Sequence, residues 1–219
     1  MVQATPDATS DDAWMEVPSK WLDRGLLVVI SGPSGVGKGT VVRALMQDPD
    51  ADGRSVRLSV SVTTRQPRPG EVEGVSYFFR SHEEFDELVR QDALLEWAEY
   101  QGHRYGTPRT FVEAERNAGR DVILEIDVQG GRQIRERGED AIYIFMVPPS
   151  MDELAQRLTD RATEDAASIA GRLGVARAEM RALPLYDYLV INDEVPAAVT
   201  RIRGILQAEH CRVAHLRRE

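Results

Sequence analysis

The fold of this chain is decided by residues 26–40, which read LLVVISGPSGVGKGT. The five apolar residues 26–30 predict a strand that is covered on both faces, as strands of parallel sheets are. A glycine-rich run from Gly32 to Thr40 follows directly, and an apolar-periodic helix follows that run. This order of strand, loop and helix is the context in which a phosphate-binding P-loop occurs.

The residue types of the loop suit a nucleoside triphosphate. Glycines let the backbone curl so that several N–H groups converge on phosphate oxygens, and the start of the following helix adds partial positive charge. Lys38 is expected to place a mobile cation against the β- and γ-phosphates. We therefore predict that ATP binds to the residues of the loop, Gly32, Pro33, Ser34, Gly35, Val36, Gly37, Lys38, Gly39 and Thr40.

One position departs from the usual P-loop pattern. Gly39 stands where Ser or Thr normally supplies a magnesium ligand, and Thr40 offers a hydroxyl one residue later. The sequence therefore specifies no certain protein ligand for Mg²⁺. Because Mg²⁺ keeps several waters, we expect it to be held by nucleotide oxygens and water, near Thr40 and Glu125.

Further apolar runs alternate with helical stretches along the chain. Residues 122–126, 141–147 and 188–191 predict buried strands, and residues 58–62 form a more polar candidate. Two helix starts are expected, at Thr107 as N-cap before Pro108 and at Ser150 in a capping box; Gly119 suits the end of the first. The alternation predicts an α/β fold with a three-layer α/β/α core around a parallel sheet.

Residues 61–107 interrupt this alternation. They combine aromatic side chains and glycines with short strand-like runs around one helix, from Ser81 to about Gln91, that opens with a capping box. This composition predicts a small inserted α+β lobe. We expect a flexible N-terminal extension at residues 1–24, followed by core with the P-loop at 25–60 and the lobe at 61–107. Core follows at 108–154, a helical lid region at 155–183, and core with the C-terminal helix at 184–219.

Composition sets limits on the partners and on the compartment. The formal net charge of −9, from 36 acidic and 27 basic residues, argues against general binding of nucleic acid or anionic membranes. The lone Cys211 is interpreted as a thiol without a catalytic role. A single cysteine cannot form an intrachain disulfide, which is compatible with a reducing compartment. With neither a signal peptide nor a spanning apolar run, the expected location is the cytoplasm. The sequence specifies no oligomeric state.

Residues 61–71, SVTTRQPRPGE, point to a second anion site. Arg65 and Arg68 are three residues apart and are stiffened by Pro67 and Pro69, an arrangement that suits bidentate binding of a phosphate dianion. The alternative is a solvated basic loop.

From about Gly25 to about Glu209 the chain resembles the guanylate kinase family. The resemblance rests on the P-loop, on SVTTRQPRPGEVEGVSYFF at 61–79 and on LLEWAEYQGHRYGT at 94–107. It implies an ATP:GMP phosphotransferase that uses Mg²⁺ and forms ADP and GDP reversibly, with dGMP as a further acceptor. It also implies a GMP site made of Ser61, Arg65, Arg68, Glu71, Tyr77, Glu96, Tyr105, Thr107 and Asp127.

Within that site the resemblance assigns the phosphate to both arginines and both tyrosines, and the base to Ser61, Glu96, Thr107 and Asp127. Guanine chemistry agrees with this assignment, because a Glu96 carboxylate can accept from N1–H and N2–H₂ together while the Thr107 hydroxyl donates to O6. Adenine would present an unprotonated N1 to Glu96 and be rejected. Either acid of Glu125-Ile126-Asp127 could orient Mg²⁺-bound water or the guanine amine, and we favour Asp127 for the base. The family usually has Asp-Ile-Asp here.

The resemblance further implies a mobile lid whose arginines contact the ATP phosphates, and an adenine-side turn at Asn192. Arg157 and Arg161 are four residues apart and are expected on one helix face, with Arg172 beyond them; a solvated, salt-bridged face is the alternative. We expect in-line transfer without an obligatory general base, because a phosphate oxygen is already anionic. The residues assigned to catalysis are Lys38, Arg65, Arg161 and Arg172.

Two other functions remain open. A phosphotransferase of the same fold could use another acceptor, such as a ribose bisphosphate, and would not need Tyr77, Glu96 and Thr107 together. A catalytically silent module could instead recruit phosphorylated protein segments. The intact glycines and Lys38 of the loop favour an enzyme over such a module.

Overall fold

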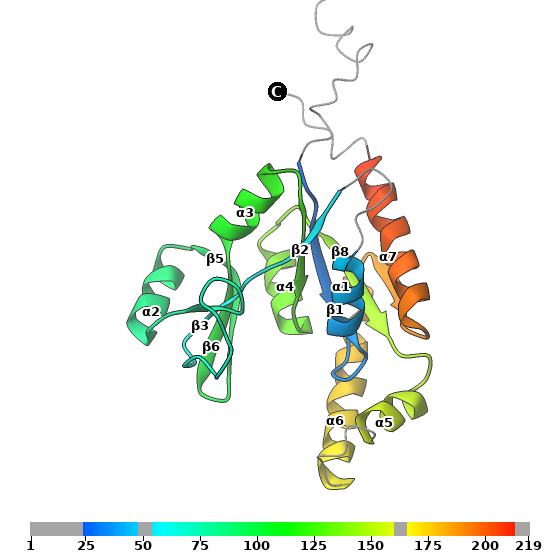
Figure 1. Cartoon of the computed structure of the whole chain (residues 1–219). Helices are drawn as coiled ribbons and strands as arrows, with labels where there is room; N and C mark the ends of the chain where they lie inside the picture. The colour runs from blue at the N-terminus through cyan, green and yellow to red at the C-terminus, as the bar shows by residue number, and fades with distance from the viewer. Residues whose placement is uncertain (1–23, 48–53, 160–165, 213–219) are drawn as a thin grey trace, which may run out of the picture.

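The computed structural model of this chain describes residues 24–47, 54–159 and 166–212. Its core is a five-stranded sheet in the order β2-β7-β1-β8-β9, and every neighbouring pair is parallel. The predicted parallel sheet is confirmed, and β1 lies at its centre (Figure 1). The strands of this sheet are β1 Leu27–Ser31, β2 Val56–Leu58, β7 Asp121–Glu125, β8 Ile142–Val147 and β9 Tyr188–Ile191.

Helices cover both faces of the sheet, because successive side chains of a strand point to opposite faces. Val28 and Ile30 of β1 pack with α1 and α7, whereas Leu27 and Val29 pack toward α3 and α4. This two-sided burial explains why residues 26–30 are apolar without alternation. The covering helices are α1 Lys38–Gln47, α7 Val195–His210, α3 Arg109–Asn117 and α4 Val128–Glu136.

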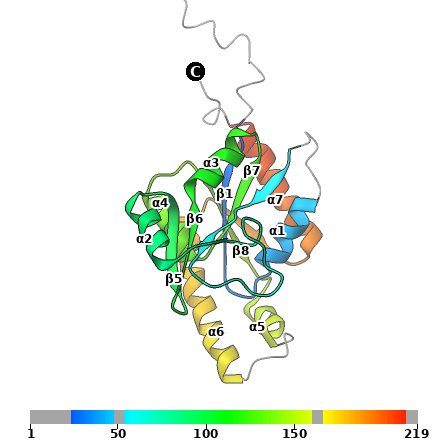
Figure 2. The same cartoon turned by 60° about the vertical axis from the view of Figure 1, so that its left-hand side comes forward.

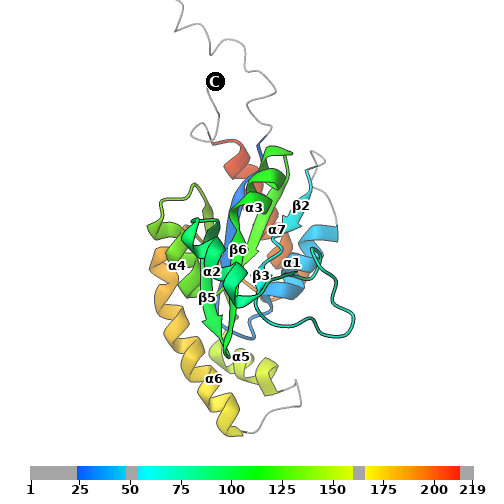
Figure 3. The same ribbon diagram turned by 90° about the vertical axis from the view of Figure 1, so that its left-hand side faces the viewer.

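The inserted lobe lies beside α4 and has its own small core (Figures 1 and 3). Its four-stranded sheet has the order β4-β3-β6-β5. Val62, Phe85 and Leu94 are buried together, and the partly buried Phe78 and Trp97 pack against them. The elements of the lobe are β3 Val62–Thr63, β4 Phe78–Phe79, α2 His82–Arg90, β5 Leu94–Tyr100 and β6 His103–Pro108.

Two further helices project beyond the end of the core sheet at which the P-loop lies (Figures 1 and 2). They are α5 Met151–Thr159 and α6 Ala166–Glu179, and a 3-10 helix, η3 Met180–Leu185, leads from α6 to β9. Arg161, one of the predicted lid arginines, and the N-terminal extension at residues 1–23 lie outside the described residues. None of the described helices is both long and apolar enough to cross a membrane.

The predicted strand at 58–62 is wrong as a single element. Residues up to Leu58 belong to β2 and pair with β7 of the core, whereas Val62 begins β3, which pairs within the lobe sheet. The backbone changes partners between them: Ser59 N–H donates to Ile123 O at 2.9 Å, and Ser61 O accepts from Phe78 N–H at 2.8 Å. This polar stretch is therefore the crossing from core to lobe.

The predicted helix ends are correct in part. Ser81 forms the expected capping box with Glu84, and Gly119 follows α3 with a φ of 76°. Ser150 caps α5 through a 3.0 Å bond from Glu153 N–H, while the Glu153 carboxylate pairs with Arg157. Thr107 is not an N-cap, because it lies buried in β6 and its hydroxyl bonds a carboxylate; α3 starts after Pro108.

Candidate active site

The P-loop joins β1 to α1 and needs its glycines for two reasons. Gly32, Gly35 and Gly37 have φ values of 150°, 89° and 97°, a region that side chains disfavour. A Cβ would also collide at each: at Gly32 it would lie 2.1 Å from the Met146 carbonyl oxygen, and at Gly37 2.7 Å from Asn192 Nδ2. Side chains at these three positions would therefore prevent the close contacts of the loop backbone with its neighbours, and glycine allows them.

A cavity of about 450 Å³ opens over this loop. Lys38 lies in it at the start of α1, and its ammonium donates to Gly32 O at 2.6 Å. Burial lowers the pKa of Lys38, while the nearby carboxylates of Glu125, Glu179 and Asp127 oppose that shift. The lining residues are Ser34, Gly35, Gly37, Lys38, Gly39, Thr40, Arg43, Glu125, Ile126, Asp127 and Glu179.

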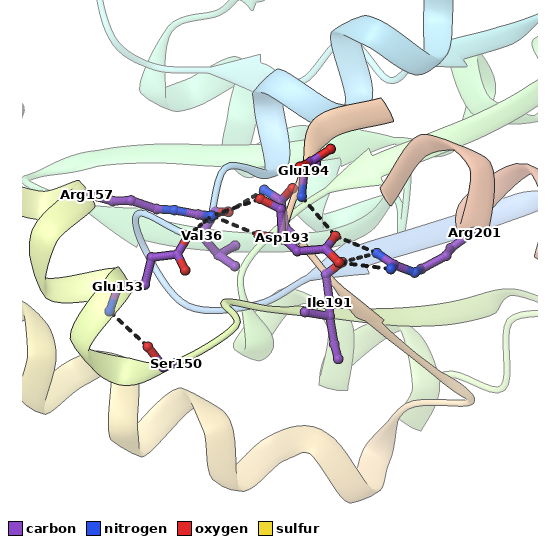
Figure 4. A network of polar contacts seen from close by, with 9 residues as sticks. Val36, Ser150, Glu153, Arg157, Ile191, Asp193, Glu194 and Arg201 are labelled. Carbon is purple, nitrogen blue, oxygen red and sulfur yellow. Dashed lines mark hydrogen bonds and ion pairs between the residues drawn. The ribbon is translucent and has the colours of Figure 1, made fainter. Parts of the chain in front are cut away.

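Arg157 and Asn192, both predicted to bind ATP, brace the loop from outside this cavity. Arg157 donates to Val36 O at 3.3 Å (Figure 4). Asn192 Nδ2 donates to the same oxygen at 2.7 Å, and Asn192 O accepts from Arg157 at 2.9 Å. Arg201 forms an ion pair with Asp193 at 2.6 Å, which anchors the turn after β9. The same contact holds the pKa of Asp193 well below its usual range. The contact of Arg157 and Asn192 with ATP remains a prediction.

Helix α6 reaches the loop at Ser34 through two side chains. Arg172 donates to the Ser34 hydroxyl at 3.0 Å, and the Ser34 N–H donates to the Glu179 carboxylate at 3.2 Å. Arg172 was among the predicted residues, whereas Glu179 was not. Nothing in the local sequence marks Glu179, because it becomes part of the cavity only through the packing of α6.

Gly39 faces the carboxylate of Glu125. A Cβ at Gly39 would lie 3.3 Å from each Glu125 oxygen and 3.5 Å from Arg43 Nη1. Burial raises the pKa of Glu125, and the charges of Lys38 and Arg43 counteract it. Within the described residues no three His, Cys, Asp or Glu side chains are grouped to hold a metal by themselves. The oxygens of Glu125 and Thr40 suit Mg²⁺ only together with oxygens from nucleotide and water.

The second predicted anion site lies in the lobe. Arg65 donates to both carboxylate oxygens of Glu71, at 2.8 and 3.1 Å, and Arg68 N–H donates to the same carboxylate at 2.7 Å. The hydrogen bond from Arg65 lowers the pKa of Glu71. The Arg65 guanidinium lies 5.4 Å from the Tyr77 ring centroid, and the Tyr77 and Tyr105 rings are 6.1 Å apart. Arg65, Tyr77 and Tyr105, three of the predicted phosphate ligands, are thus neighbours, and the fourth, Arg68, is tied to Glu71 through its backbone.

A buried carboxylate marks the predicted base site. Glu96 is 6% exposed, and the fully buried Thr107 hydroxyl donates to it at 2.6 Å. Burial raises the pKa of Glu96 to about 7; the Thr107 bond opposes the shift and the charge of Asp127 adds to it. Asp127 caps α4 by accepting from Gln129 and Gly130 N–H, both at 2.9 Å. Ser61 lies at the crossing into the lobe.

This fold and these two sites define a P-loop kinase of nucleoside monophosphates. The chain belongs to the guanylate kinase family, whose model matches residues 24–209. It is 52% identical over 191 residues to the guanylate kinase of Desulfitobacterium hafniense, covering 87% of this chain and 94% of that protein. The guanylate kinase of Enterococcus faecalis is 49% identical over 191 residues, with 87% and 92% covered.

A solved structure agrees with this assignment. The crystal structure of guanylate kinase from Anaplasma phagocytophilum superposes with a TM-score of 0.66 at 34% identity, and covers 88% of this chain and 90% of that one.

Proposed function

We propose that this protein transfers the γ-phosphoryl group of ATP to GMP, and also to dGMP, in a reversible Mg²⁺-dependent reaction that forms ADP and GDP. The observation that carries the proposal is the buried Glu96–Thr107 pair, on a chain that also has an intact P-loop lysine. A carboxylate beside a hydroxyl matches the donors and the acceptor of guanine once the Thr107 proton, which now goes to Glu96, turns to O6 of the base. Family membership supports the same reaction.

The donor nucleotide is assigned to the cavity over the P-loop. Loop N–H groups and Lys38 would hold the β- and γ-phosphates, and the present bond from Lys38 to Gly32 O would yield to phosphate oxygens. Arg172 already contacts the Ser34 hydroxyl of the loop, and we assign it to the ATP phosphates. Arg157 and Arg161 are assigned to the same phosphates, and Asn192 to the adenine side.

The acceptor is assigned to the lobe. Arg65, Arg68, Tyr77 and Tyr105 would hold the GMP phosphate, with Glu71 orienting Arg65. The base would lie between Glu96, Thr107, Ser61 and Asp127. Because a phosphate oxygen of GMP is itself the nucleophile, these residues contribute position and charge neutralisation rather than proton abstraction.

Mg²⁺, when bound to the nucleotide, would neutralise charge on the transferred group. We assign Glu125 and Thr40, which line the cavity, to hold it directly or through water. We assign residues 61–107 as the GMP-binding lobe and residues 155–183 as the lid. Closure of both would exclude water and limit ATP hydrolysis. The protein is assigned to the cytoplasm, where Cys211 would stay reduced.

Acceptor specificity tests the proposal. ADP formation should be measured with ATP and Mg²⁺ and with GMP, dGMP, AMP, CMP, UMP or ribose 1,5-bisphosphate, and the products should be separated chromatographically. We expect rapid GDP formation and essentially inert AMP. Turnover of the ribose bisphosphate instead would replace the acceptor, and folded, ATP-binding protein without turnover of any acceptor would refute the kinase.

A further inference from the structure

A β-bulge in the lobe determines where the Glu96 carboxylate points. In the β5–β6 pair, Leu94 lies opposite Pro108 and Trp97 lies opposite Gly106, so three steps on β5 match two on β6. Such a bulge bends the strand and changes the direction of a side chain. Glu96 lies within the bulged stretch. Its direction therefore depends on what holds the bulge in place.

Gly106 makes room for the bulge on β6. A Cβ at this position would lie 3.0 Å from the Glu96 carbonyl oxygen and 3.0 Å from the Trp97 Cβ. The missing side chain thus permits the close approach of β5 to β6, but it provides no bond that fixes the bulge.

The fixing bonds come from α4 in the core. Strand β5 is at the edge of the lobe sheet, so one side of its backbone has no strand partner among the described residues. Gln133 occupies that side: its side-chain oxygen accepts from Trp97 N–H at 3.2 Å, and its side-chain amide donates to Trp97 O at 3.0 Å. The backbone groups determine which end of the carboxamide is which. One side chain thereby holds the residue directly after Glu96.

A second residue of α4 makes room for the carboxylate. A Cβ at the buried Gly130 would lie 3.0 Å from Glu96 Oε2 and 3.2 Å from Ile126 Cδ1. The Gly130 N–H also donates to Asp127 Oδ1 at 2.9 Å. Gly130 therefore lies between the two carboxylates assigned to guanine.

We propose that Gln133 and Gly130 are positioning residues for guanine recognition, which set the Glu96 carboxylate by clamping its bulged strand to α4 and by leaving space for its oxygen. The inference rests on the proposed function and deepens it. In this arrangement Glu96 accepts from both N1–H and N2–H₂ of the base. Inosine 5′-monophosphate (IMP) lacks the 2-amino group and can make only the first of these bonds, so a displaced Glu96 penalises GMP more than IMP.

The test compares Gln133→Leu and Gly130→Ala with the wild type and with Gln207→Leu. Gln207 is an exposed glutamine of α7 whose side chain makes no hydrogen bond to any described residue, which makes it a matched control. Calorimetry gives Kd for GMP and IMP, steady-state rates give KM for ATP, and thermal unfolding reports folding. Alanine at Gly130 favours the helix, and its nearest contacts are the far ends of the Glu96 and Ile126 side chains, which can shift. We therefore expect this variant to fold even if Gln133→Leu does not.

For both positioning variants we expect Kd for GMP to rise about tenfold and the preference for GMP over IMP to fall about fivefold, as expected for loss of a bond to a charged group. KM for ATP should stay within about twofold of wild type in all proteins. Unchanged GMP affinity and unchanged preference in folded variants would overturn the inference, as would parallel losses for GMP, IMP and ATP. A wild type that binds no GMP refutes the proposed function itself, a result visible before any variant is compared.

Discussion

The hydroxyl of Thr107 donates a 2.6 Å hydrogen bond to the carboxylate of Glu96, and both side chains are buried where β5 meets β6. The partners are eleven residues apart in sequence and come from the two strands of one hairpin. The pair places a proton acceptor and a hydroxyl side by side in a site that is shielded from water. Such a pair makes the recognition of a base sensitive to pH.

GMP binding is expected to weaken as the pH falls below 7. Burial raises the pKa of Glu96 to about 7, and only the ionised carboxylate can accept both guanine donors. Well below pH 7 the Kd for GMP should therefore rise toward about tenfold per pH unit. Calorimetric titrations from pH 5.5 to 8.5 provide the test, with Glu96→Gln as the control that retains titration of the GMP phosphate. Identical pH profiles for the two proteins would contradict the prediction.

Glu96→Gln is expected to stabilise the free protein at pH 8. The pKa of Glu96 is about 7 in the folded state against an ordinary value of 4.5, so the folded state binds more protons between these values. Stability from this group is therefore fully present below pH 4.5, declines as the pH rises to 7 and stays low above it. The variant should gain on the order of 1–3 kcal/mol at pH 8 and little at pH 4.5. Denaturant unfolding at both pH values measures this, and an equal gain at both would refute the titration argument.

Gly39 and Glu125 are expected to depend on each other. In Gly39→Ser the new Cβ would lie 3.3 Å from both Glu125 oxygens, so the carboxylate must give way by a few tenths of an ångström. Glu125→Asp shortens that side chain and should restore space. We expect Gly39→Ser to reduce kcat/KM for Mg²⁺-ATP about tenfold, and the double variant to recover most of the loss.

The Gly39–Glu125 cycle is completed by Glu125→Asp alone, assayed across a range of Mg²⁺ concentrations. Additive effects in the double variant, with no recovery, would mean that the two positions act independently.

Glu179→Gln is expected to tighten ATP binding. The Glu179 carboxylate accepts from Ser34 N–H at 3.2 Å and lines the cavity assigned to the triphosphate. A negative charge there opposes the phosphates, and its removal should lower Kd for ATP about threefold to tenfold at low salt. Calorimetry at two salt concentrations tests this, since the gain should shrink at the higher one. Weaker ATP binding in the variant would instead make Glu179 a ligand of the nucleotide.

The sequence alone determined the elements whose cause is local. The continuous apolar run at 26–30 specifies a strand buried on both faces, because no solvent-facing alternation is present. The capping box at Ser81 specifies the start of α2, since its hydrogen bonds span only three residues. The glycines and Lys38 also mark a phosphate loop locally, because the positive φ values of Gly32, Gly35 and Gly37 suit glycine whatever packs against the loop.

Tertiary structure decided which distant polar groups meet. Thr107 has the sequence pattern of a helix cap, yet it bonds Glu96, because β-pairing brings the two strands together and buries both side chains. Glu179 enters the phosphate cavity, and Gln133 clamps Trp97, only through the packing of α6 and α4. Local periodicity reports backbone conformation and burial, whereas the partner of a buried polar group is set by the requirement that it be hydrogen-bonded after packing. The hydrogen-bond partners of these buried groups come from distant segments of the chain, and the local sequence around each group does not show which segment will pack against it.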